Sequence, residues 1–320
     1  MIQDTVIKMS LAPIVLFVYN RLWHTQQTVE ALKKNELAKE SELFIFSDAP
    51  KGKDDNEKVK EVRNFIKTIN DFKHVTIVER EENFGLAKSI ITGVTEIVNR
   101  YDRIIVLEDD MISSPYFLRF MNDALEFYND EEKVISIHGY IYPVKAQLPE
   151  TFFLRGADCW GWATWKRGWN LFEQDGKKLL YELRKCNLKM EFDVNGSCDL
   201  MGMLEGQVIG KNDSWAIRWH ASAFLGNKLT LYPGKALVSN IGFDGTGRHC
   251  APCKNFDVEL SKRPILVKKI EVKEDKYVLR QIEEFYRSLK PNIYKRVKNK
   301  AVYIVGKASA FLKNLLTYKK

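Results

Sequence analysis

Short apolar runs alternate with amphipathic segments along the first third of the chain. The run APIVLFVYN (12–20) is continuously apolar and rich in Val, which is typical of a strand buried on both faces. The pattern predicts further strands at 42–48, 74–80 and 103–107, and helices at 24–35, 56–69 and 85–100. Strands that alternate with helices favour right-handed β-α-β units. We therefore expect an α/β fold, a mostly parallel sheet with helices on both faces.

Polar residues follow the predicted strands where each one ends. Arg21 follows the first strand, Asp48 the second, and Glu108, Asp109 and Asp110 the fourth. Ligands of parallel sheets bind outside the carboxyl ends of the strands, so these side chains mark the expected site. Three adjacent carboxylates repel one another and are costly to bury, and a positive partner is therefore expected.

A hard divalent cation, Mg²⁺ or Mn²⁺, is one such partner, because it prefers carboxylate oxygens and shares its coordination with phosphates. The alternative is a solvated acidic loop, or acids that favour the N-terminus of the helix predicted after residue 113. Ser114 and Pro115 are expected to provide the cap and first turn of that helix already, which favours the cation.

The pattern changes after about residue 140. Four of the seven tryptophans lie in DCWGWATWKRGWNLF (158–172), and the segment 227–249 is rich in Gly and turn residues. No internal repeat interrupts the chain, so we interpret this part as a continuation of the same domain. The five cysteines are an odd number in a chain of 320 residues, which indicates reduced thiols in a cytosolic protein.

The net charge of +8 comes from one end of the chain. Residues 291–320 contain eight basic residues and no acidic one, whereas the other 290 contain 42 of each. Lysines alternate there with Val, Ile, Phe and Leu, which predicts one or two amphipathic helices on an anionic membrane surface. A packed helix or a disordered end is the alternative.

Nucleic acid is not expected as a partner, because the rest of the chain is neutral. No bilayer-spanning run or signal-peptide layout occurs.

Several short motifs together resemble one group of enzymes. IIVLEDD (104–110) is similar to the acidic metal motif of GT-A glycosyltransferases, in the form found in the N-acetylglucosaminyltransferase I family. The first strand with Arg21 resembles the nucleotide-binding opening of glycosyltransferase family 2. The other similar segments, in the same order as in these families, are NFGLAKSI (83–90), CWGWATWKRGW (159–169) and YPGKALVSNIGFDGTGRH (232–249).

The resemblance implies a GT-A fold, which is a Rossmann-like α/β fold, and covers roughly residues 12–250. It places the catalytic domain at 1–255, with a nucleotide-sugar half at 1–130 and an acceptor half at 131–255. Residues 256–290 are expected to form a C-terminal extension, and 291–320 the basic tail.

The resemblance also assigns roles to the residues at the strand ends. It implies that Asp110 binds the metal and that Glu108 and Asp109 contact the sugar and the ribose. A divalent ion there would stabilise the nucleoside diphosphate that leaves. Arg21 is expected to meet the same phosphates. Asp48 matches the acid that binds uracil, although its sequence SDAPKG is equally typical of a turn.

Other site residues are implied less directly. Asn83 and Lys88 are candidates for the nucleoside face. His249 is a candidate metal or phosphate ligand, or a hydrogen-bonded loop histidine. The motif HCAPC that contains it lacks the second ligand pair of a structural zinc site. The tryptophans of the Gly-Trp segment are expected mostly in the core, with one or two stacking on the acceptor; they are Trp160, Trp162 and Trp165.

An enzyme that inverts the anomeric centre also needs a base for the acceptor hydroxyl. Asp213 lies beside Trp215, in the interval where the family has its catalytic aspartate. Asp199 and Glu205 are rivals, and an aspartate before a predicted helix is often only an N-cap.

These expectations combine into one function, with two alternatives. It is the transfer of a sugar such as N-acetylglucosamine from a UDP-sugar to a saccharide or glycolipid acceptor, in polysaccharide biosynthesis at the inner face of the plasma membrane. A nucleotidylyltransferase would need a Gly-rich phosphate loop, and VYNRLWHT (18–25) has no glycine. The other alternative is a non-catalytic glycan- or membrane-binding protein that retains the fold.

Overall fold

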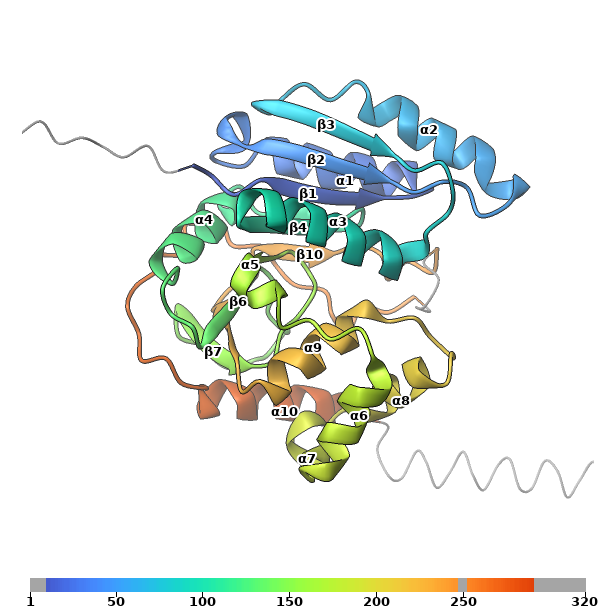
Figure 1. Cartoon of the computed structure of the whole chain (residues 1–320). Coiled ribbons are helices and arrows are strands. Elements are labelled where there is room, and N and C mark those ends of the chain that lie inside the picture. Colours follow the sequence, from blue (N-terminus) through green and yellow to red (C-terminus); the bar gives the residue numbers. More distant parts are fainter. Residues whose placement is uncertain (1–9, 247–251, 291–320) are drawn as a thin grey trace, which may run out of the picture.

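The computed structural model describes residues 10–246 and 252–290, so His249 and the basic tail 291–320 lie outside the described residues. Two sheets run through this part of the chain (Figure 1). The strands of the large sheet are β1 (Ile14–Val18), β2 (Glu42–Ser47), β3 (His74–Glu79), β4 (Arg103–Glu108), β6 (Val134–His138), β7 (Thr151–Arg155), β8 (Trp162–Trp165) and β9 (Leu229–Pro233). The small sheet pairs β5 (Met111–Ser113) with β10 (Val238–Asn240).

Helices cover the large sheet and form a lobe beside it. They are α1 (Leu22–Lys33), α2 (Asn56–Ile66), α3 (Gly85–Tyr101), α4 (Phe117–Phe127), α5 (Lys166–Trp169), α6 (Gly176–Lys185), α7 (Lys189–Phe192), α8 (Leu200–Val208), α9 (Trp215–Leu225) and α10 (Lys276–Leu289), with 3₁₀ turns at Ala38–Glu40 and Lys53–Asp55. The predicted α/β fold is confirmed.

The strand order of the large sheet is β3-β2-β1-β4-β8-β6-β9-β7. The first four strands are parallel, β8 runs against both β4 and β6, and β9 is parallel to β6. β7 closes the far edge antiparallel to β9. One continuous sheet therefore contains strands from the early, regular part of the chain and from the part after residue 130.

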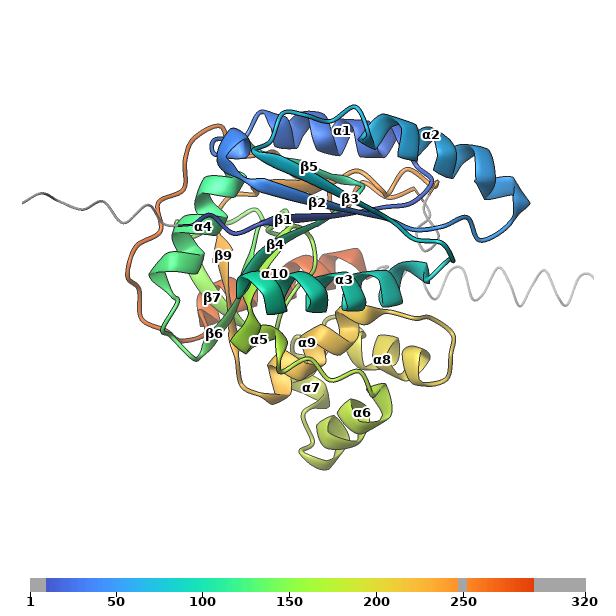
Figure 2. The ribbon, with the colours of Figure 1, turned by 45° about the horizontal axis from the view of Figure 1, so that its top comes forward.

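Successive side chains of β1 point to opposite faces of the sheet, and both sets are apolar, which explains why helices cover both faces. Ile14 and Leu16 pack with α1, α2 and α4 on one face, whereas Val15 and Phe17 pack with α3 and α9 on the other. Figure 2 shows α1 and α2 above the first strands and α3 below them. A strand that is apolar at every position fits only between two such layers.

One predicted detail of this region is wrong, and one element was missed. The helix expected from Ser114 and Pro115 onward begins at Phe117, with Tyr116 as its N-cap. Ser114 instead continues the path of β5, because its backbone N–H donates to the oxygen of Leu237 at 2.8 Å. The small β5–β10 sheet was not predicted at all.

The tryptophan-rich segment contributes to the core. Trp162 is completely buried, and its ring lies 5.6–5.9 Å from the rings of Trp169, Trp215 and Trp219. Trp165 is also buried, so the expectation of core packing holds for these two residues. Trp160 is half-buried against Tyr140 and is the member of the trio that reaches the surface. The cluster fixes α5 and α9 to the centre of the sheet.

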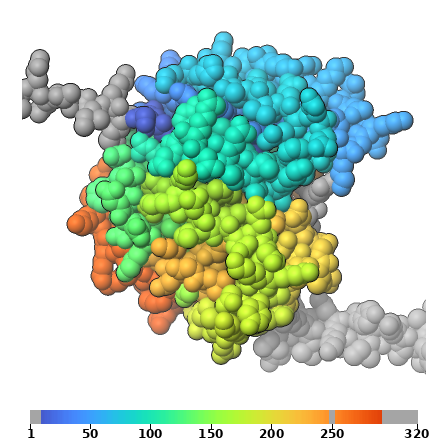
Figure 3. All heavy atoms as spheres, viewed as in Figure 1, coloured from blue at the N-terminus to red at the C-terminus, as the bar shows by residue number. Residues whose placement is uncertain are grey.

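A helical lobe projects beside this sheet. Leu183 of α6, Leu204 of α8 and Phe224 of α9 belong to its separate apolar cluster. Figure 3 shows the lobe, in yellow-green, at the bottom of the molecule.

No helix in residues 10–246 and 252–290 is long and apolar enough to cross a bilayer. The four cysteines within these ranges are free thiols.

We predict that Trp162→Leu lowers the free energy of unfolding by about 3 kcal/mol or more, because truncation of a fully buried ring leaves a cavity among the other tryptophans. Trp23→Leu is the matched control, since Trp23 is 56% exposed and should change stability by less than about 0.5 kcal/mol. Urea unfolding followed by circular dichroism measures both. Equal losses in the two variants would contradict the central role of the cluster.

Candidate functional site

The candidate site lies where β1 and β4 end side by side. Phe17 of β1 is paired with Glu108 of β4 in parallel register, so the residues that follow the two strands leave the sheet together. Arg21 comes from the β1 side, and Asp109 and Asp110 come from the β4 side. The sequence predicted that these side chains lie together at the carboxyl edge of the sheet.

Arg21 is the positive partner that the acidic run required. Its Nη2 donates to Oδ2 of Asp110 at 2.6 Å and also to Oδ1 of Asp109. The three side chains are 80% or more shielded from solvent, so the pairs are weakly screened. The adjacent carboxylates are thus neutralised in part by the chain itself.

Segments far apart in the sequence hold the two aspartates. The Thr28 hydroxyl donates to the backbone oxygen of Asp109 at 2.8 Å. The backbone N–H of Ile241, after β10, donates to the backbone oxygen of Asp110 at 2.9 Å. Gly242 lies so close that an added Cβ would stand 2.1 Å from Oδ2 of Asp110. The cluster therefore depends on the return of the chain near residue 240.

The environment favours protonation of two of the acids. Burial, and then the charges of Asp110 and Asp109, raise the pKa of Glu108 to about 8. Burial also raises the pKa of Asp109 to about 6, and the charge of Arg21 opposes this shift. Burial acts to lower the pKa of Arg21, but the charges of both aspartates outweigh it and the pKa is raised. The site therefore has more negative groups than its own cation can balance.

Asp110 retains an unused ligand position. Its Oδ1 is buried and has no hydrogen-bond partner among the described residues. A buried carboxylate oxygen is normally paired, so this atom suits an ion or water. No group of three or more His, Cys, Asp and Glu side chains in residues 10–246 and 252–290 is arranged to hold a metal ion.

The predicted nucleoside residues lie at the ends of β2 and β3. Asp48 accepts hydrogen bonds from the backbone N–H groups of Ala49, Phe84 and Gly85, at 2.8–3.0 Å, and from Nδ2 of Asn83 at 3.1 Å. These four donors occupy the roughly four acceptor positions of a carboxylate. Asp48 thus fastens the end of β2 to the start of α3.

Asn83 and Lys88 lie on the same side of the site. Asn83 also donates to the backbone oxygen of Ala49 at 2.6 Å. Lys88 is exposed, with its Nζ 3.8 Å from the centroid of the Phe84 ring. The structure brings Asn83 to Asp48 but gives neither residue a contact with Arg21 among the described interactions.

Asp213 lies at the start of α9, and its side chain is 76% exposed. Ser214, not Asp213, is the N-cap, because its hydroxyl accepts from the N–H of Ile217 at 3.2 Å. Asp213 accepts only from Arg218, at 3.1 Å, among the described contacts.

The rival carboxylates have other partners. Asp199 is the N-cap of α8 and accepts from the N–H of Gly202. Glu205 forms an ion pair with Arg184 at 2.8 Å. Each of the three candidate bases therefore has one partner among the described contacts, and Asp213 and Asp199 are both exposed.

Several polar residues near the strand ends escaped the sequence prediction. Asp55 accepts from the Tyr19 hydroxyl and from Nδ2 of Asn20, each at 2.8 Å, and so fixes the chain just before Arg21. His24 lies 3.0 Å from Asp244, which links α1 to the turn after β10. The only signal for these pairs was the polar character of DDNE and GFDG.

A buried polar group also lies at the end of β6. His138 is completely buried, neither of its ring nitrogens has a hydrogen-bond partner within the described ranges, and Asp158 is 3.7 Å away. Asp158 accepts from the Tyr142 hydroxyl at 3.1 Å and from the N–H of Cys159. Burial lowers the pKa of His138, so the imidazole is kept neutral.

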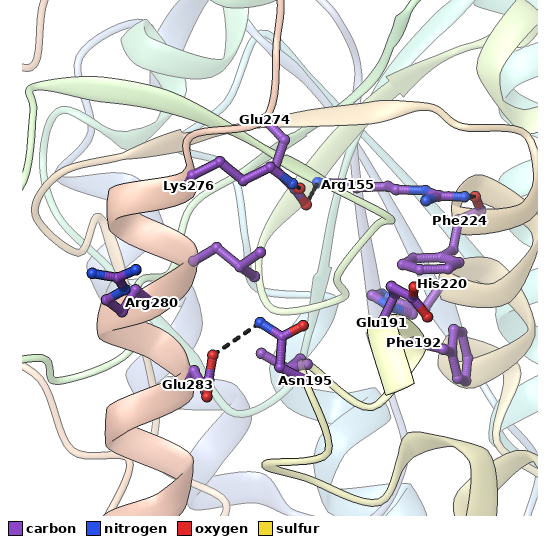
Figure 4. A pocket seen from close by; sticks show the side chains of 12 residues that line it. Arg155, Glu191, Phe192, Asn195, His220, Phe224, Glu274, Lys276, Arg280 and Glu283 are labelled. Carbon is purple, nitrogen blue, oxygen red and sulfur yellow. Dashed lines mark hydrogen bonds and ion pairs between the residues drawn. The ribbon is translucent and has the colours of Figure 1, made fainter. Parts of the chain in front are cut away.

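A cavity of about 300 Å³ lies away from these strand ends, between α7, α9 and α10 (Figure 4). None of the predicted site residues lines it. Its polar side chains contact one another: Glu274 pairs with Lys276, and Asn195 donates to Glu283 at 2.9 Å. Its lining also includes carboxylates and arginines, but it lies apart from the ends of β1 and β4.

We predict that Glu108→Gln changes the pH dependence of stability. The pKa of Glu108 is higher in the folded protein than in the unfolded chain. Between pH of about 4.5 and about 8 the folded protein therefore binds a proton that the unfolded chain has lost. Wild-type stability accordingly falls as the pH rises through this range. The melting temperature of the variant relative to wild type should increase by several degrees between pH 5 and pH 8.5. Melting scans with chelator measure this. Glu126→Gln, at a side chain that is 43% exposed, is the control variant. A melting-temperature difference between Glu108→Gln and wild type that does not change with pH would contradict the prediction.

We predict that Gly242→Ala displaces Asp110 or the turn after β10, because no space exists for the added Cβ. The melting temperature should fall by several degrees, which corresponds to about 1–3 kcal/mol of overpacking. Gly52→Ala is the matched control, since nothing lies within 4 Å of its Cβ position. Equal melting temperatures for the two variants would show that the turn does not pack on Asp110.

Comparisons with known proteins give limited similarity. No protein-family model matches the chain, and no curated protein matches it. The mannosyltransferase PcManGT from Pyrobaculum calidifontis, in complex with GDP-Man and Mn²⁺, is 14% identical over 41% of this chain and 36% of its own, with a TM-score of 0.31. TarS from S. aureus is 14% identical over 45% of this chain and 24% of its own, with a TM-score of 0.30.

A UDP-glucose pyrophosphorylase complexed with UDP-glucose is 12% identical over 70% of this chain and 90% of its own, with a TM-score of 0.35. The chain spans less than half the length of the mannosyltransferase and of TarS. Similarities this low carry no argument about activity. The α/β fold is shown by the order and direction of the strands themselves.

Proposed function

We propose that the protein is a GT-A glycosyltransferase that takes its sugar from a nucleoside diphosphate donor. The observation that carries this proposal is the cluster of Arg21, Asp109 and Asp110 at the carboxyl ends of β1 and β4. A guanidinium next to carboxylates at this edge combines a phosphate-binding group with a place for a divalent cation. The five motifs of the sequence support the same function.

A divalent ion, Mn²⁺ or Mg²⁺, would bind at Asp110. The buried and unpartnered Oδ1 of this residue fits a hard cation, which can take one or two carboxylates and complete its coordination with waters and phosphates. The bound ion would act as a Lewis acid toward the departing diphosphate. His249 remains a candidate further ligand, although it lies outside the described residues.

The neighbouring residues would bind the rest of the donor. In this proposal Arg21 pairs with the diphosphate, and Glu108 and Asp109 contact the sugar and the ribose. Asn83 and Lys88 would contact the nucleoside. A uracil contact by Asp48 would require the exchange of one of its four existing hydrogen bonds, because no acceptor position is left over.

Asp213 is the base in an inverting reaction of this kind. Its exposed carboxylate would accept the proton of the acceptor hydroxyl while that oxygen attacks the sugar. Arg218, which donates to it, would keep the carboxylate oriented. We further propose a UDP-sugar, with N-acetylglucosamine as the sugar, and a saccharide or glycolipid acceptor reached at a membrane surface through the tail 291–320.

A nucleotide-release assay tests the proposed function. Purified protein is incubated with UDP-, GDP- and dTDP-sugars in the presence of Mn²⁺, Mg²⁺ or chelator. We expect slow hydrolysis of one donor, lost with chelator and reduced at least about 100-fold in Asp110→Asn, because the leaving diphosphate then loses its cation. Asp123→Asn, on the exposed face of α4, is the matched control and should keep the wild-type rate.

The outcomes separate the alternatives. If no donor is hydrolysed, calorimetry with UDP and Mn²⁺ on the same protein decides between them. Metal-dependent binding of UDP would indicate a transferase that needs its acceptor. Absence of binding for every nucleotide would refute the enzyme and favour the non-catalytic binding protein.

A further inference from the structure

We propose that Arg21 is the built-in counter-ion of Asp110, that it competes with the divalent cation for this carboxylate, and that a diphosphate removes the competition by drawing Arg21 away. This inference rests on the proposed function, because it concerns the same site. Metal and nucleotide would then bind cooperatively, each weakly on its own. The chain's own residues, not a third ligand, would produce this coupling.

The contacts of Arg21 with the two aspartates are the basis of this inference. A single nitrogen, Nη2 of Arg21, donates to one oxygen of Asp109 and, at 2.6 Å, to Oδ2 of Asp110. The other oxygen of Asp110 is buried and unpartnered within the described residues. A cation bound to that oxygen would lie a few ångströms from the guanidinium, since both would share one carboxylate. Two positive charges at this separation, shielded from water, repel each other strongly.

The position of Arg21 gives it a second set of partners. It directly precedes α1, and its backbone oxygen is fixed by the N–H and the hydroxyl of Thr25 at 3.0 and 2.9 Å. The side chain beyond this anchor is long, and the described contacts use one of the three guanidinium nitrogens. The planar fork of N–H groups matches phosphate oxygens in a bidentate manner.

A diphosphate therefore changes the balance at Asp110. When phosphate oxygens pair with Arg21, they replace Asp110 as the partner of the guanidinium, and the carboxylate becomes available to the cation. The phosphates also supply oxygen ligands that the described part of the chain lacks, since it holds no group of three metal-binding side chains. Free Mn²⁺ should accordingly bind weakly, and UDP should tighten its binding.

Titrations with Mn²⁺ alone and with Mn²⁺ plus UDP test the coupling. Free Mn²⁺ is counted by electron paramagnetic resonance with the full-length chain. Wild type should bind Mn²⁺ weakly, and UDP should tighten binding at least tenfold. Arg21→Gln should bind Mn²⁺ alone about tenfold more tightly than wild type, because one nearby positive charge has been removed, and UDP should add little further affinity.

Two further variants act as controls. Arg21→Lys keeps the charge and should keep the weak binding of Mn²⁺ alone, whatever happens to UDP. Arg103→Gln, which removes an arginine paired with Glu126, should behave as wild type. Circular dichroism establishes that each variant is folded. If Arg21→Gln is not, the wild-type titrations still test the coupling, because Mn²⁺ binding that is equally tight with and without UDP would refute it.

The results distinguish this inference from the proposed function. If wild type binds Mn²⁺ with UDP but Arg21→Gln binds Mn²⁺ alone no more tightly than wild type, the counter-ion role is refuted and the function stands. If UDP has no effect but Arg21→Gln still tightens Mn²⁺ binding, the counter-ion role stands and the proposed UDP donor is refuted. If none of the proteins binds Mn²⁺, the inference is refuted.

Discussion

The parallel pairing of β1 and β4 is the constraint on which the candidate site depends. The central residues of both strands are apolar and buried on both faces, so charged groups occur only at the strand ends, as Arg103 and Glu108 do in β4. The first positions at which the chain can carry charge are those at and just past the strand ends. Arg21 and the acidic run are therefore brought together by the same packing that forms the core. Their mutual neutralisation in turn allows the acidic run to remain mostly shielded from water.

The regular part of the fold could be predicted because its signal is local. The apolar runs of β1 to β4 and the helices between them were all predicted, with boundaries within a few residues of those observed. The β5–β10 pair could not be predicted, since strands of three residues have no measurable period. The same limit applies to Gly242, which reaches Asp110 only through that pairing.

The candidate site was predictable in its location but not in its partners. The three acids at a strand end indicated a missing positive charge, and Arg21 was assigned to phosphates only, not to the acids themselves. Contacts between side chains 88 or 89 residues apart leave no trace in one sequence. The buried His138 beside Asp158 was missed for the same reason, because nothing in the tryptophan-rich segment that begins at Asp158 indicates a histidine partner.

Asp48, Asp110 and Asp213 show why residue type alone does not assign a role. Each follows or precedes a regular element, and each has a function in the resemblance to GT-A enzymes. Asp48 is buried and its acceptor positions are filled by four N–H donors, as burial of a carboxylate demands. Asp110 is almost as buried, yet one oxygen has no partner among the described residues.

Asp213 does not need hydrogen-bond donors from the protein, because water can solvate its exposed carboxylate. A carboxylate can take part in chemistry only with acceptor capacity that folding has not already used. By this criterion Asp110 and Asp213 remain available to a cation and to a proton, whereas Asp48 serves mainly to hold α3 against β2. The criterion uses only burial and hydrogen bonding, and it ranks the three aspartates without reference to any relative.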